Sequence, residues 1–100
     1  MGLDLSIRKI GKTKTNKQGQ SYWIITDILR LHNTWNFLDK LGDYSTNIAN
    51  CCKTTFSGED MYGAANKITN EEEKEIVLKE LKEAGVKNSE DIFYEVYPRW

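Results

Sequence analysis

The sequence predicts one α+β domain in which a small antiparallel sheet packs against two or three helices. Three observations lead to this class. Apolar and polar residues alternate near both ends of the chain, which is the period of a strand with one buried face. Helix-capping patterns occur between these two regions. A chain of 100 residues suffices for one core, so we expect a single domain over residues 1–100.

The N-terminal region predicts the first strand. Leu3, Leu5 and Ile7 fall on one face of it, and the residues between them are polar. Residues 11–20 contain no large apolar side chain and are rich in Gly, Asn and Thr, which is typical of a mobile loop or a wide hairpin turn. If this segment is a turn, residues 21–25 around Tyr22 form the returning strand.

A first helix is predicted to follow the Tyr22 region. Thr26 or Asp27 can cap it, because a short side-chain oxygen accepts a bond from a free first-turn N–H. Apolar residues follow at helical spacing: Ile28, Leu31, Trp35 and Leu38. Gly42 is predicted to end the helix in the left-handed conformation. Residues 43–56 fit either a helix or an irregular strand, and the sequence leaves their structure open.

Two further helices are predicted from their caps. Ser57 and Asp60 have the spacing of a capping box, and four residues would line the buried face of the helix that follows: Met61, Ala64, Ala65 and Ile68. Thr69 and Glu72 predict a second cap, and Gly85 predicts the end of a helix over residues 70–84. Its buried stripe would contain Val77, Leu78, Leu81 and Ala84.

The C-terminal region predicts the last strand. Ile92, Tyr94 and Val96 alternate with Phe93, Glu95 and Tyr97, and Pro98 is predicted to end the strand. The aromatic cluster of Phe93, Tyr94, Tyr97 and Trp100 is expected to be core plus a docked tail. Any exposed share of it would form an interface.

Composition narrows the class of protein. The net charge of −1 names no partner by itself. The N-terminus lacks a signal-peptide apolar region and no apolar run has membrane-spanning length, so we expect a cytoplasmic protein that does not contact a membrane. Cys51 and Cys52 are adjacent and are expected to be free thiols. With only His32 besides them, we expect no metal site.

The sequence contains no recognisable catalytic pattern. The glycines at 11 and 19 are not followed by the Lys-Ser/Thr pair of a phosphate loop, and no nucleophile lies in an elbow-like turn. His32 is the single histidine and therefore the first residue to test as a general base, with Trp35 one turn away on the predicted helix. A structural role for His32 beside Trp35 is the favoured interpretation. We predict a protein without cofactor or catalytic residues, not an enzyme.

One basic segment is the candidate binding site. Between Leu5 and Thr26 the chain has five cations and no acid: Arg8, Lys9, Lys12, Lys14 and Lys17. These side chains could contact a nucleic-acid backbone, a nucleotide phosphate or an acidic protein surface, and Tyr22 and Trp23 could stack on a base. The alternative is a solvated turn beside two core aromatic residues.

Several short patterns together resemble a group of small proteins encoded by bacterial viruses and prophages. These are the start Met1-Gly2-Leu3-Asp4, the Tyr22-Trp23 pair, His32 with Trp35, and the aromatic segment from Phe93-Tyr94 to Trp100. The resemblance implies a phage accessory protein acting in a bacterial cytoplasm. Small proteins of this kind often bind and block a host protein, including components of antiviral defence.

Three hypotheses follow. The first is a non-enzymatic binder that inhibits a host protein, in the manner of an anti-CRISPR protein. The second is a nucleotide or nucleic-acid binding module that uses residues 8–23. The third is a small hydrolase based on His32. The sequence identifies neither the partner nor the oligomeric state, and a homodimer is one of the options.

Overall fold

The computed structural model describes residues 2–50 and 52–100, with the backbone alone described at Lys12 and Ala49. Met1 and Cys51, which belong to the sequence predictions above, lie outside the described residues. The chain forms four strands, three α-helices and a short 3-10 helix: β1 (Asp4–Thr15), β2 (Ser21–His32), α1 (Trp35–Leu41), η1 (Thr46–Asn50), β3 (Thr54–Ser57), α2 (Gly58–Asn66), α3 (Glu71–Glu83) and β4 (Phe93–Arg99).

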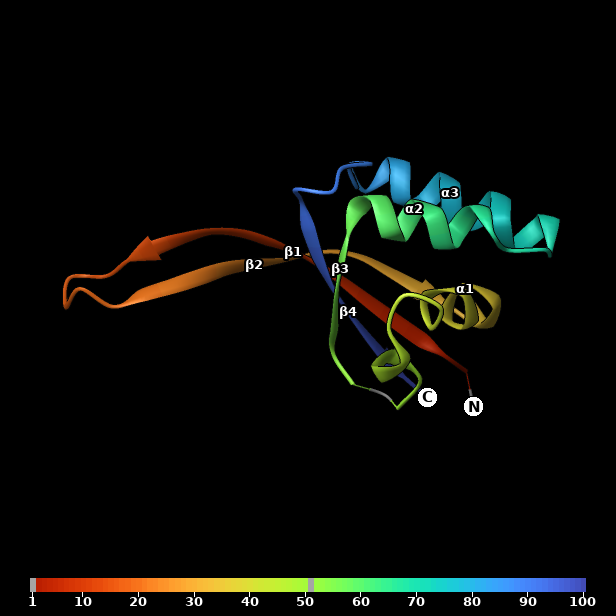
Figure 1. Ribbon diagram of the computed structural model, residues 1–100, viewed down its shortest axis with the longest axis horizontal. Helices are drawn as coiled ribbons and strands as arrows, with labels where there is room; N and C mark the ends of the chain where they lie inside the picture. Colours follow the sequence, from red (N-terminus) through yellow and green to blue (C-terminus); the bar gives the residue numbers. More distant parts are fainter. Residues whose placement is uncertain (1, 51) are drawn as a thin grey trace.

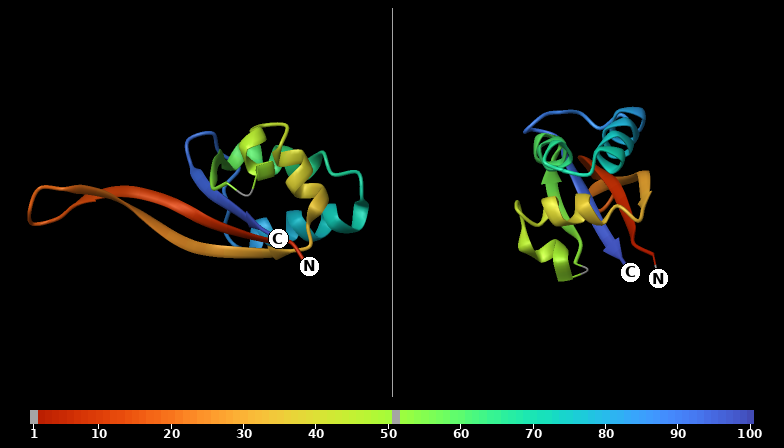
Figure 2. Two further views of the ribbon diagram at one scale, coloured as in Figure 1. Left: turned by 90° about the horizontal axis from the view of Figure 1, so that it is seen from below. Right: turned by 90° about the vertical axis from the view of Figure 1, so that its right-hand side faces the viewer.

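All four strands belong to one antiparallel sheet with the order β2-β1-β4-β3. The N-terminal and C-terminal strands are therefore neighbours in its centre, with Asp4 opposite Arg99. Helices α2 and α3 lie side by side over the sheet (Figures 1 and 2). This arrangement confirms the predicted α+β class, and β3 adds an edge strand within the segment that the sequence left open.

The first predicted helix is wrong over residues 28–32, which continue β2. A β-bulge explains why the sequence of this part of β2 resembles that of a helix. Ile7 pairs with Leu29 whereas Arg8 pairs with Asp27, so Ile28 is an extra residue in β2. An extra residue shifts the alternation of a strand by one position, and the apolar side chains on the two sides of the bulge then have a spacing that resembles a helix.

The helix itself is α1, and it begins only at Trp35. Thr34 precedes it, so neither Thr26 nor Asp27 is a cap. Gly42 follows α1 with φ of −60°, which is right-handed, so the predicted left-handed ending is also wrong. The left-handed residue here is Asn33, with φ of 56°, in the tight connection between β2 and α1.

Strands β1 and β2 extend beyond the rest of the sheet as a two-stranded arm. The pairing of β4 with β1 ends at Lys9, so residues 10–25 have no third strand. Part of the predicted loop over 11–20 is therefore strand, and the turn is short: Asn16 N–H donates to Gln20 O at 2.9 Å, and Gly19 has φ of 80°. The arm gives the molecule extents of 49 × 26 × 20 Å (Figure 1).

The caps of α2 and α3 explain where these helices begin. Ser57 Oγ accepts a bond from Asp60 N–H, which confirms the predicted cap of α2. Helix α3 begins one residue later than predicted, because the side chain of Asn70, not Thr69, accepts the bond from Glu73 N–H at 2.9 Å. Gly85 follows α3 with φ of 81°, and it ends the helix as predicted.

The core lies between the sheet and the helices. It is built from side chains of the sheet, of the residue before β1 and of all three α-helices, among them Leu3, Leu5, Ile7, Phe37, Leu41, Phe56, Met61, Ala64, Ala65, Val77, Leu81, Tyr94 and Val96. Pro98 lies within β4 and does not end it. Since β3 pairs with β4 only up to Val96, Pro98 lies where one edge of β4 has no strand partner. Among the described residues, no helix has the length and hydropathy needed to cross a bilayer.

Tyr62 links α2 to the segment after α3 and makes stability depend on pH. Its hydroxyl donates to the carbonyl of Val86 at 2.7 Å, and burial, with a smaller contribution from Tyr94, raises the pKa of Tyr62 above its ordinary value of 10.0. The unfolded chain then loses this proton first, so the contribution to stability is complete below pH 10 and is lost as pH rises above it.

We expect Tyr62→Phe to lower the free energy of unfolding by about 1 kcal/mol near neutral pH, because the Val86 carbonyl loses its donor. Urea unfolding of both proteins at about pH 8 and about pH 10.5 tests the second part: the variant should lose less stability than the wild type on this rise in pH. Equal losses would contradict the raised pKa.

A candidate binding surface at the base of the arm

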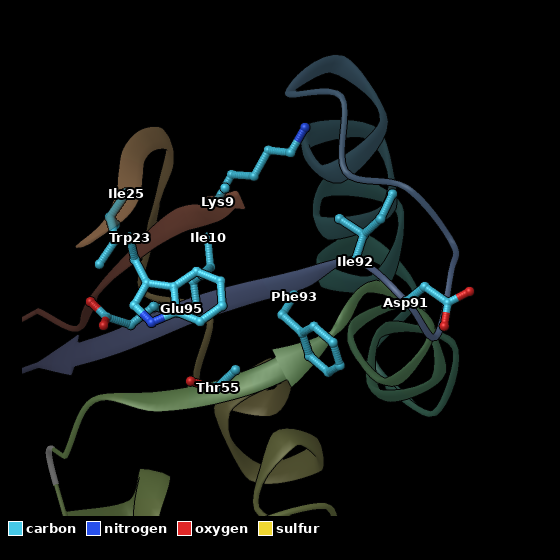
Figure 3. Close-up of a pocket in the computed structure, with 10 residues that line it drawn as sticks. Lys9, Ile10, Trp23, Ile25, Thr55, Asp91, Ile92, Phe93 and Glu95 are labelled. Atoms are coloured by element: carbon cyan, nitrogen blue, oxygen red, sulfur yellow. The ribbon is translucent and has the colours of Figure 1, made fainter. Parts of the chain in front are cut away.

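An open pocket of about 860 Å³ lies where the arm leaves the sheet. Residues from four segments line it: Lys9, Ile10 and Gly11 from β1, Trp23 and Ile25 from β2, Thr55 from β3, and Asp91, Ile92, Phe93 and Glu95 from the start of β4 and the loop before it. In Figure 3 the indole of Trp23 and the ring of Phe93 lie on the same side of the sheet, and Lys9 extends away from Trp23. The pocket therefore has an aromatic residue from each of two strands.

Strand alternation places five of these residues on the face that the helices leave uncovered: Ile10, Ile25, Thr55, Phe93 and Glu95. Tyr94 and Val96 are buried under the helices, so Phe93 and Glu95 point to the opposite face. Ile10 and Ile25 pair across the arm, and Thr55 pairs with Glu95. The surface exposes large apolar side chains: Trp23 is 62% exposed, Phe93 45% and Ile25 43%.

One of the two carboxylates that line the pocket, that of Glu95, is paired with Arg8. Arg8 Nη2 lies 2.8 Å from Glu95 Oε1, and Arg8 Nε lies 3.6 Å from Asp27 Oδ1. The Glu95 side chain is only 17% exposed, so this pair is partly removed from solvent. Arg8 was predicted to bind a phosphate or an acidic partner together with the lysines, but here it contacts two carboxylates within the protein.

The structure divides the remaining basic segment. Lys9, Lys14 and Lys17 form no ion pair within the described residues, and of Lys12 only the backbone in β1 is described. Lys14 pairs with Tyr22 and Thr13 pairs with Trp23. Because neighbouring residues of a strand point to opposite faces, Lys14 and Tyr22 lie on one face of the arm and Trp23 lies on the other.

Tyr22 and Trp23 are both exposed, but their rings lie on opposite faces of the arm and do not form one stacking surface. Tyr22 is 49% exposed, so neither residue is a core aromatic. For Tyr22 and Trp23 to stack together on a base beside the lysines, as predicted, both rings would have to lie on the face of the arm that carries the lysines. Only Tyr22 shares its face with Lys14.

His32 and Trp35 lie beside the chain termini, because His32 is opposite Asp4 in the sheet and Trp35 contacts Trp100. Both termini lie away from the arm (Figure 1). The sequence predicted His32 and Trp35 on one helix, but His32 is the last residue of β2 and only Trp35 lies in α1. The Nδ1 atom of His32 lies 2.5 Å from Asp4 Oδ1. An Nδ1–H donated to Asp4 would leave Nε2 as a proton acceptor. His32 does not line the pocket at the base of the arm.

Two exposed tryptophans lie in this region. The rings of Trp35 and Trp100 are 5.8 Å apart between centroids and inclined by 55°, and they are 45% and 46% exposed. The predicted interface potential of the C-terminal aromatic residues is thus divided: Tyr94 is core, Phe93 lines the pocket and Trp100 packs on Trp35. Cys52 is an exposed free thiol, and the described residues contain no group of three His, Cys, Asp or Glu side chains that could hold a metal.

Sequence reasoning identified Trp23 and missed Ile10, Ile25 and Thr55 as its neighbours. The sequence feature that points to Ile25 is the alternation of residues 21–25, in which Trp23 and Ile25 share a face. Ile10 and Thr55 join them only through strand pairing. No protein-family model, curated protein or solved structure matches the chain. The candidate surface therefore rests on the residues of this chain alone.

Proposed function

We propose that the protein is a non-enzymatic binding module that holds a partner protein on the arm surface, defined as Ile10, Trp23, Ile25, Thr55 and Phe93. One observation carries this proposal: Trp23 and Phe93 frame an open apolar pocket on the sheet face that the helices leave bare. Tryptophan and other aromatic side chains are the anchors on which protein interfaces most depend.

The chemistry of the pocket favours a protein over a small ligand. Sites for small molecules usually enclose the ligand and direct several polar groups toward it. The pocket is open, and of its two carboxylates, Asp91 and Glu95, the second is already paired with Arg8. A stable protein complex needs about 800 Å² from each partner. The exposed arm and the pocket at its base offer a continuous surface on which such an area can form.

The resemblance to small phage proteins supports an inhibitory form of the proposal. A small domain with a projecting arm can block a host protein by occupying its surface, with no chemistry of its own. We propose a component of bacterial antiviral defence as the kind of host protein that is bound.

Nucleic-acid binding is the second candidate function. It is supported by four lysines without an acidic residue over positions 9–26. It is supported less by the arm's aromatic residues, because Trp23 and Lys14 lie on opposite faces. Binding of this kind would weaken steeply with salt and with loss of the lysines.

Trp23→Ala tests the protein-binding proposal. Immobilised wild-type protein should retain a stoichiometric partner from a bacterial lysate, and the variant should retain at least about tenfold less, because the largest anchor of the surface is removed. Quantitative mass spectrometry of the captured proteins measures the ratio.

Trp35→Ala is the matched control, because it removes the same residue type at comparable exposure from the opposite end of the molecule. It should leave capture unchanged. Loss of capture in Trp35→Ala but not in Trp23→Ala would move the binding surface to the Trp35 and Trp100 pair. Circular dichroism of both variants confirms that they are folded.

A further inference from the structure

We infer that the partner contributes an extended acidic strand that pairs with the free edge of β2, an inference that rests on the proposed function and specifies the partner's chemistry. Strand β2 is the last strand on its side of the sheet and has 12 residues. The strand at the opposite edge, β3, has only four. In the described part of the chain no strand pairs with the outer side of β2. A long edge of this kind is where an extended peptide can add to a sheet.

The backbone groups of β2 that point outward can be assigned from the turn. Asn16 N–H donates to Gln20 O, which makes these two residues a hydrogen-bonded pair. Hydrogen-bonded and non-hydrogen-bonded pairs alternate along an antiparallel ladder, so Tyr22 faces β1 with its N–H and C=O. Ser21 and Trp23 are then non-hydrogen-bonded with β1, and their N–H and C=O point toward the free edge.

The register of β1 and β2 shifts twice, between Ile10 and Thr13 and between Ile7 and Arg8. The first shift places its extra residue on β1, so the alternation along β2 itself continues through residues 21–27, and the second ends it. Ile28 is the extra residue of the bulge, and a bulge interrupts the regular order of outward groups. Before it, the sequence Ser-Tyr-Trp-Ile-Ile-Thr-Asp contains neither the proline nor the lysine with which proteins commonly protect an edge strand. The edge beside the arm surface is thus long enough, and free enough, to accept a strand.

Charge decides what kind of strand fits. Residues 9–26 contain four lysines and no acid, all four of them on or next to β1. An added strand would lie two strand spacings, about 10 Å, from the backbone of β1. This distance is comparable to the Debye length of about 8 Å at physiological salt, so screening weakens the attraction without abolishing it. Lysine side chains on β1 therefore attract an acidic strand at this position. The matching edge of a second copy, residues 21–27, offers only one acid, Asp27, and its carboxylate already lies 3.6 Å from Arg8, so a second copy would not supply the acidic strand.

The free edge of β2 also distinguishes a peptide partner from a nucleic-acid partner. A phosphate backbone accepts hydrogen bonds but offers no donor to the outward C=O groups of Ser21 and Trp23, whereas a peptide strand satisfies both kinds of group. The lysines alone would suit either partner. The unpaired strand edge favours the peptide.

Selection from a display library of random 12-residue peptides on the immobilised full chain provides the probe. The enriched peptides should alternate apolar residues with Asp or Glu and lack proline. On binding of a synthetic selected peptide, amide hydrogen exchange at Ser21 and Trp23 should slow at least about tenfold, and the Tyr22 amide, already bonded within the arm, serves as the internal control. Two N-methylated forms of the peptide should differ. Methylation of the alternate residues whose N–H groups face β2 should weaken binding at least about tenfold, and methylation of the residues between them should not.

Two variants complete the test. Ser21→Pro removes an outward N–H and should weaken the peptide. The triple change of Lys9, Lys14 and Lys17 to Ser should weaken it and flatten its salt dependence. Suppose that a selected peptide loses its binding to Trp23→Ala and yet leaves the hydrogen exchange of the Ser21 and Trp23 amides unchanged. That result would contradict strand addition but would still support the proposed function. A concentration-dependent dimer with the same amides protected would assign the edge to a second copy.

The remaining outcomes count against the inference as well. Protection by a single-stranded 20-nucleotide DNA but by no selected peptide would assign the segment to nucleic acid. Enrichment of no peptide would overturn the acidic strand, and if Trp23→Ala also left lysate capture unchanged, the proposed function would fail with it.

Discussion

Gly58→Ala should destabilise the protein by about 3 kcal/mol, because α2 begins in direct contact with the backbone of the segment before β4. A Cβ at residue 58 would lie 1.7 Å from the carbonyl oxygen of Lys87, and the N–H of Gly58 donates to Ile92 O at 2.8 Å. Two backbone segments hold each other here, so neither can yield without breaking the connection. Urea unfolding monitored by tryptophan fluorescence measures the change.

Gly63→Ala is the control for this prediction, since it adds the same methyl group to the same helix. Its Cβ would meet only the hydroxyl end of Tyr44, which can move, and alanine favours the helix interior by about 1 kcal/mol. We expect no loss of stability in this variant. Equal stabilities of the two alanine variants would show that the approach of Gly58 to Lys87 does not constrain the fold.

Glu73→Ala is expected to cost about 1–3 kcal/mol, because Glu73 of α3 caps the start of α1. Its Oε2 accepts the Phe37 N–H at 2.7 Å, and its Oε1 accepts the Asn36 side-chain N–H at 3.2 Å. Thr34, the residue before α1, makes no side-chain cap bond, so the carboxylate of another helix takes that role. Thermal and urea unfolding should both report the loss.

Glu72→Ala is the matched control, because Glu72 also lies in the first turn of α3 but is exposed. Both variants lose the same favourable interaction with the helix dipole, so their difference isolates the cap of α1. If Glu72→Ala and Glu73→Ala had equal effects, the contact between α3 and the start of α1 would contribute nothing to stability.

The elements that the sequence predicted well are those with local determinants. Leu3, Leu5 and Ile7 alternate without interruption, and Ser57 caps α2 as its spacing with Asp60 predicted. The prediction for the second half of β2 was wrong because the bulge at Ile28 depends on pairing with β1, which the local sequence does not encode. Strand β3 is four residues long and is stabilised by β4, so its own sequence carries little information.

The candidate surface could be predicted only in part, for the same reason. Trp23 was predicted as a binding residue from its type and neighbours and lines the pocket, but Phe93 reaches this pocket from the far end of the chain through the sheet. The neutralisation of Arg8 by Glu95 likewise needs β4 beside β1. Which charges are free to bind a partner is therefore a property of the topology and not of the charge pattern along the chain.

The pairing of Asp4 with Arg99 also governs how the chain can fold during synthesis. The central ladder joins residues from Asp4 with Arg99 to Lys9 with Tyr94, at opposite ends of the sequence. It therefore cannot form until β4 has left the ribosome, and closing so long a loop is entropically costly. Before that moment β1 and β2 can form a hairpin by themselves, with Leu5, Ile7 and Leu31 still uncovered. The nascent chain thus passes through a stage in which its apolar strand face is open to chaperones or to aggregation.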